Sequence, residues 1–91
     1  MGDTYEVINI EGLTLQIEKF DDSNEGRRKR MAAVCVGIRN VTGKNRKDFA
    51  EWLGIPYRTM TDWERTVRVA PEYLIRLIAY KVRMEEVIAK K

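Results

Sequence analysis

Apolar and polar residues alternate along the first part of the chain. Residues 7–10 and 13–17 are β-branched or alternating and flank the turn dipeptide Glu11-Gly12. This pattern predicts two antiparallel strands joined as a hairpin. One face of the hairpin is apolar and carries five residues: Ile8, Ile10, Leu13, Leu15 and Ile17. Because an isolated hairpin is only marginally stable, we expect this face to pack on the rest of the chain or on a second copy.

The period of the pattern changes after a polar linker at residues 21–26. A helix is predicted from Arg27 to the glycine at position 43, because apolar residues recur there every three or four positions. These residues are Met31, Val34, Cys35, Ile38 and Val41. The linker is rich in turn and capping residues, so we expect the helix to begin soon after it.

Two short helices follow, separated by one tight turn. Asn45 is a candidate N-cap for a helix over residues 46–53, and Gly54 supplies the left-handed residue that ends a helix sharply. Pro56 then fixes the entry into a helix over residues 57–65. Met60 and Trp63 should face inward. This leaves on the outer side of the helix four residues: Tyr57, Arg58, Thr61 and Asp62.

A final helix is predicted from Pro71 through Glu72 to Ala89, a stretch without a helix breaker. Its apolar residues form two stripes. The first stripe consists of Leu74, Ile78 and Val82, and the second of Tyr73, Leu77, Tyr80, Met84 and Val87. Together they are wider than a small helical body needs. We therefore expect the second stripe to meet either the hairpin or a second copy, and we favour the homodimer.

Composition places the chain among folded single domains. It has 91 residues, of which 44% are hydrophobic and 34% charged. The pattern divides it into a hairpin at residues 1–22 and a helical part at residues 23–91. The single cysteine, Cys35, cannot form an internal disulfide, so we expect a small buried thiol. With no signal-peptide pattern and no apolar run of spanning length, a cytoplasmic location is expected.

Charge is distributed unequally along the chain. Residues 1–26 hold seven acids and one lysine, a net charge of −6, whereas residues 27–91 hold 16 Lys or Arg and seven acids, a net charge of +9. This asymmetry indicates a polyanion-binding body with an acidic appendage. The basic run Arg27-Arg28-Lys29-Arg30 is interpreted in two ways, as a solvated first turn or as a phosphate contact.

The absence of histidine narrows the possible chemistry. It removes the commonest general base and, with a single cysteine, every standard zinc site. No paired acids stand inside an apolar segment where a shifted pKa would be expected. We therefore predict no catalytic residues, no metal site and no cofactor.

The central segment resembles the Xre, or phage-repressor-like, helix-turn-helix family. The resemblance covers about residues 31–84 and rests on the stretch from Arg46 to Pro56 followed by Arg58-Thr59-Met60 and Asp62-Trp63-Glu64. Four features agree: the small Ala50, the turn glycine Gly54, the apolar Ile55 and the Trp63-Glu64 pair. The resemblance implies a mainly α, four-helix, lambda-repressor-like helix-turn-helix domain, here preceded by a β-hairpin, and a bacterial or phage origin.

The resemblance also implies roles for individual residues. Tyr57, Arg58, Thr61 and Asp62 would contact bases, with Arg58 reading a guanine through its two parallel donors. Phosphate contacts would come from Arg46, Lys44, Asn45, Arg65 and Arg68. Arg39 and Glu64 match positions that form an ion pair between helices. This sequence departs from the family at two positions, with Arg46 in place of a glutamine and Thr66 in place of a glycine.

These observations lead to one expected function and two alternatives. We expect a sequence-specific regulator of transcription, a repressor that occupies promoter DNA as a dimer. The first alternative is a DNA-binding antitoxin whose acidic hairpin or final helix binds a basic toxin. The second is a protein-interaction module, or inhibitor, whose acidic hairpin mimics DNA.

Overall fold

A computed structural model describes residues 4–89 and, within the last helix, side chains as far as residue 86. The chain is mainly helical, with four helices preceded by a two-stranded antiparallel hairpin, as the pattern predicted. The elements are β1 (Tyr5–Ile10), β2 (Leu13–Glu18), α1 (Asn24–Thr42), α2 (Arg46–Leu53), α3 (Tyr57–Glu64) and α4 (Glu72–Ala89). Among these described elements, no helix has the length and apolar character needed to cross a bilayer.

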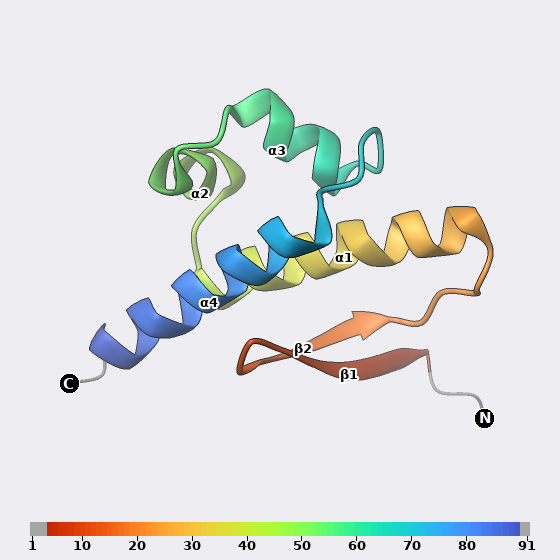
Figure 1. Cartoon of the computed structure of the whole chain (residues 1–91), viewed down its shortest axis with the longest axis horizontal. Coiled ribbons are helices and arrows are strands. Elements are labelled where there is room, and N and C mark those ends of the chain that lie inside the picture. Colours follow the sequence, from red (N-terminus) through yellow and green to blue (C-terminus); the bar gives the residue numbers. More distant parts are fainter. Residues whose placement is uncertain (1–3, 90–91) are drawn as a thin grey trace.

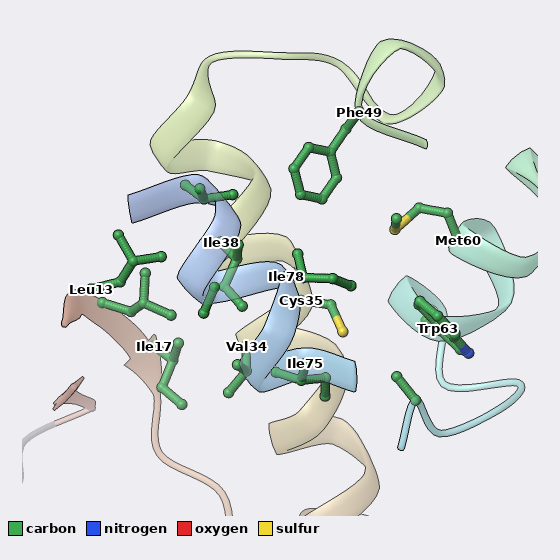
Figure 2. Packing of buried hydrophobic residues seen from close by; sticks show 14 of the residues in the cluster. Leu13, Ile17, Val34, Cys35, Ile38, Phe49, Met60, Trp63, Ile75 and Ile78 are labelled. Atoms are coloured by element: carbon green, nitrogen blue, oxygen red, sulfur yellow. The ribbon is translucent and has the colours of Figure 1, made fainter. Parts of the chain in front are cut away.

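The elements are arranged in three layers, with α1 and α4 in the middle. The hairpin lies on one side of these two helices, and α2 and α3 lie on the other side (Figure 1). The core runs through all three layers. Leu13 and Ile17 of the hairpin lie on one side of α1, whereas Met60 and Trp63 of α3 lie on its other side (Figure 2).

The hairpin forms as expected because its turn residues adopt positive φ angles. Glu11 has φ 49° and Gly12 has φ 88°, which brings Ile10 opposite Leu13 and Ile8 opposite Leu15. The β2 side chains of the apolar face are buried, and Ile8 and Ile10 are half-buried. Since these residues belong to the same core as the helices, residues 4–22 and the helical part pack as one body.

α1 begins at Asn24, three residues before the predicted start at Arg27, because Ser23 within the predicted linker acts as its N-cap. The Ser23 hydroxyl accepts a hydrogen bond from the Gly26 amide at 3.0 Å, and Gly43 ends the helix with φ 72°. Val34, Cys35 and Ile38 are buried, as the periodicity predicted. Met31 and Val41 are half-buried at the edges of the same face.

α4 buries only part of what the pattern predicted. Its core side consists of Ile75, Ile78, Ala79 and Val82, so the prediction missed Ile75 and Ala79 and placed the half-buried Leu74 too deep. The predicted second stripe is exposed, because the hairpin packs against α1 and the core side of α4. Of the two alternatives, the hairpin and a second copy, the hairpin is therefore ruled out as the cover of Tyr73, Leu77, Tyr80 and Met84, and the side chain of Val87 lies outside the described residues.

Candidate nucleic-acid interface

The connection between α2 and α3 is built by three residues with fixed conformations. The Asn45 side-chain oxygen accepts a hydrogen bond from the Asp48 amide at 2.7 Å, which caps the start of α2. Gly54 ends α2 with φ 74°, a left-handed conformation that glycine adopts without strain. Pro56 precedes α3 with φ −56°, and α3 begins at the next residue. The sequence prediction of two short helices across one tight turn is confirmed.

α3 is anchored by one side and exposed on the other. Met60 and Trp63 are only 1% and 7% exposed, and Met60 is among the largest fully buried side chains. Arg58 lies on the opposite side and is exposed, whereas Tyr57, the first residue of the helix, lies on the flank beside Met60 and is 52% exposed. This orientation follows from the spacing of the two anchors, because residues three apart share one side of a helix.

The other two predicted base-contacting residues already have partners within the protein. The Thr61 hydroxyl donates a hydrogen bond to the Tyr57 carbonyl at 2.9 Å, and its side chain is half-buried. Asp62 lies 3.7 Å from the guanidinium of Arg68, and within the described chain it forms no ion pair with Arg58. Tyr57 and Arg58 are therefore the two residues of the set whose side chains are most available to a ligand.

The buried carboxylate of Glu64, the last residue of α3, connects α3 to α1 and α2. The side chain of Glu64, 1% exposed, accepts hydrogen bonds from Arg39 Nε at 2.8 Å and from Arg39 Nη2 at 3.1 Å. It also accepts one from Arg46 Nε at 3.0 Å. Charge-assisted bonds of this kind are short and directional, so they fix the end of α3 against α1 and the start of α2.

Arg39 and Glu64 thus form the ion pair that the family resemblance implied, but the second arginine was not foreseen. The family resemblance implied that Arg46 binds phosphate, whereas in the structure its guanidinium is held by Glu64 and lies 3.5 Å from the Thr61 hydroxyl. The hydrogen bond to Glu64 raises the pKa of Arg46. One carboxylate faces two guanidinium groups, so this cluster keeps a net positive charge.

The remaining predicted phosphate-contacting residues divide into two groups. Lys44 lies 5.5 Å from the centre of the Trp52 ring and the Asn45 side chain caps α2, so both are engaged locally. Arg65 is exposed and, within the described chain, forms no ion pair; Arg68 is exposed beside Asp62. Lys47 of α2 is also exposed and forms no ion pair among the described residues. The sequence prediction did not include Lys47, and its charge was the only signal that could have pointed to it.

The basic run at the start of α1 has partners of its own. Arg28 Nη2 donates a hydrogen bond to the Thr66 carbonyl at 2.9 Å, and Arg30 Nη2 pairs with Glu6 at 3.0 Å. Lys29 lies 3.9 Å from Glu25, one helical turn earlier. Arg28 and Arg30 therefore match neither of the two interpretations of this run. Arg28 connects α1 to the loop after α3, and Arg30 connects α1 to the hairpin.

The loop after α3 keeps the backbone shape that a glycine would give it. Thr66 has φ 64°, a left-handed conformation that is rare for a β-branched residue. The Val67 and Arg68 amides both donate to the Asp62 carbonyl, at 2.9 and 3.2 Å. Thr66 therefore holds a left-handed conformation in which glycine would carry less strain.

The surface around α3 presents polar and cationic side chains. It offers guanidinium, ammonium and phenol donors, and the described residues include no cluster of three or more His, Cys, Asp or Glu side chains that could hold a metal ion. Comparison of the chain with protein-family models, with curated protein sequences and with solved structures found no match.

Proposed function

We propose that the protein is a sequence-specific double-stranded DNA-binding regulator, a repressor in which α2 and α3 act as a helix-turn-helix of the lambda-repressor type. One observation carries the proposal. α3 is held by Met60, Trp63 and Glu64, while Arg58 is exposed on its opposite side and Tyr57 is exposed at its first position. A helix braced in this way fits the major groove, where an arginine fork can donate to the O6 and N7 atoms of guanine.

Affinity in this proposal comes from exposed cations near α3. Lys47, Arg58 and Arg65 are exposed and form no ion pair among the described residues, so their charge is available for phosphates. Neutralising phosphates releases counterions, which gives salt-dependent affinity for any sequence. The position of the acidic hairpin is consistent with phosphate binding near α3, because the hairpin lies on the opposite side of α1 and α4 from α3 (Figure 1).

A homodimer is part of the proposal, since a single recognition helix buries little surface. Two copies would occupy symmetric half-sites about 34 Å apart, one turn of the double helix. Sedimentation equilibrium with and without duplex measures the stoichiometry. One copy on a selected site that lacks a repeated half-site would contradict the dimer and leave the DNA-binding proposal standing.

The experiment that tests the function first selects, from a library of random DNA duplexes, those that the protein binds. Fluorescence anisotropy then measures the affinity of the protein for the selected duplex and for a scrambled duplex. Arg58→Ala should weaken binding to the selected duplex by about 1–3 kcal/mol, roughly fivefold to 150-fold, and should weaken binding to the scrambled duplex far less. Arg76→Ala removes the same charge from α4 and serves as the control, with similar small losses on both duplexes. Failure of the selection to enrich any sequence, or equal losses on both duplexes for Arg58→Ala, would contradict the proposal.

A further inference from the structure

The outer side of α4 carries an apolar stripe that nothing in the described chain covers. It consists of Tyr73, Leu77, Tyr80 and Met84, which are 69%, 60%, 49% and 36% exposed. At about 100° per residue, this stripe lies opposite the core side of α4 formed by Ile75, Ile78, Ala79 and Val82. Contiguous exposed apolar patches of about 300–600 Å² are often binding sites on monomers.

The spacing of the stripe identifies the shape that fits it. The four residues follow one another at intervals of four, three and four, which is the interval pattern of a coiled-coil seam. Such a seam is narrow, because it uses two positions in every seven, whereas a helix that lies in a membrane interface usually presents a wider apolar face. The geometry is therefore complementary to a second helix.

The residues beside the seam set the charge of that second helix. Arg76 and Arg83 flank the seam on the side of the hairpin, where the Arg83 side chain lies against Gly12. Lys81 flanks it on the side of α2, with its ammonium 4.9 Å from the centre of the Trp52 ring. Arg76 pairs with Glu72 at 3.1 Å, whereas Lys81 and Arg83 form no ion pair with any described residue.

A second copy of α4 matches this surface poorly. In a parallel pair Arg76 of one copy lies beside Lys81 of the other, and in an antiparallel pair Arg76 lies beside Arg83. Like charges at these flanking positions oppose pairing and select against that partner. We propose that the outer face of α4 is a docking site for an acidic amphipathic helix of another protein, with Leu77 and Tyr80 at the centre of the contact. This inference does not depend on DNA binding.

The test uses the full chain and two synthetic helical peptides of about three heptads. Both have leucine at the seam positions, and they differ only at the flanking positions, which are glutamate in one and lysine in the other. Binding is measured by isothermal titration calorimetry without DNA. The glutamate peptide should bind at least tenfold more tightly than the lysine peptide, and the double variant Lys81→Glu, Arg83→Glu should reverse this preference.

A matched pair of variants locates the contact. Leu77→Gln should weaken binding of the glutamate peptide by at least tenfold, whereas Val67→Gln should leave it unchanged, because both side chains are 60% exposed but only Leu77 belongs to the stripe. Both variants change exposed positions, so both should fold, which circular dichroism checks. Equal binding of the two peptides, or equal losses in the two variants, would overturn the proposal.

Two further outcomes would assign the stripe to another occupant and so overturn the proposal. The first is self-association of the protein alone that Leu77→Gln abolishes in sedimentation equilibrium. The second is binding to phosphatidylserine vesicles, but not to the glutamate peptide, that the same substitution abolishes. A monomer that ignores vesicles and binds the glutamate peptide supports the acidic helix. Loss of DNA binding would change none of these readouts, so the two proposals fail separately.

Discussion

Gly37, in the middle of α1, offers a quantitative test of how the hairpin packs. A methyl group added there would lie 3.5 Å from Leu15 Cδ1 and 3.8 Å from Ile17 Cγ2, which is ordinary van der Waals contact. Alanine is better than glycine in a helix interior by about 0.5–1 kcal/mol. The position is half-buried, so the methyl group adds roughly half of the ~0.8 kcal/mol expected for full burial.

Gly37→Ala should therefore stabilise the protein by about 1–1.5 kcal/mol, which corresponds to a rise in Tm of about 4–10 °C for a domain of this size. The assay is urea denaturation followed by circular dichroism, in which the midpoint should rise while the m-value stays constant.

Gly26→Ala is the contrasting variant. A methyl group at Gly26 would lie well inside contact distance of the Asp21 backbone carbonyl and side chain, so α1 would lose the geometry of its Ser23 cap. We expect a loss of about 1–3 kcal/mol, the usual cost of overpacking a fixed site. If Gly37→Ala were as destabilising as Gly26→Ala, the hairpin would have to lie closer to α1 than described, and the reasoning would be refuted.

Two other stability predictions follow from single residues. Thr66→Gly should stabilise the protein by about 1 kcal/mol, because glycine adopts the left-handed φ of 64° without strain. The carbonyl of residue 66 can still accept the hydrogen bond from Arg28. A lower urea midpoint for the variant would contradict this prediction. Burial, followed by the charge of Glu64, raises the pKa of Cys35 from 9.0 to about 12. Above pH 9 the unfolded thiol loses its proton while the folded one keeps it, so the free energy of unfolding should fall by up to about 1.4 kcal/mol per pH unit. Urea titrations of the wild type and Cys35→Ala between about pH 9 and 11 should show the steeper fall in the wild type, and parallel slopes would contradict it.

Much of the fold was predictable because its boundaries are set by local interactions. Gly43 and Gly54 end helices with positive φ, and Asn45 caps α2 through a neighbouring amide. The alternation in the hairpin fixed which side of each strand is buried, because side chains on a strand alternate between its two faces. Information of this kind lies within a few residues of each position, so a sequence pattern can reveal it.

The parts that sequence reasoning missed depend on contacts between distant segments. Arg46 and Glu64 are 18 positions apart, so their pairing depends on how α2 and α3 cross. Both sides of α4 are apolar, and the packing of α1 and the hairpin against one of them decides that Ile75 is buried and Leu77 exposed. The apolar face of the acidic hairpin was expected to pack either on the rest of the chain or on a second copy, and the structure shows the first, so deletion of the hairpin would remove core packing as well as charge.

The bonds of Glu64 have a consequence for the kinetics of association. Because this carboxylate already holds Arg39 and Arg46, the free protein presents α3 at a fixed angle. The conformational entropy of that arrangement is lost during folding and is not lost again when a ligand arrives. If α3 binds a ligand as proposed, docking should be a rigid-body encounter whose rate is limited by diffusion and mutual orientation, with no ordering step to slow it.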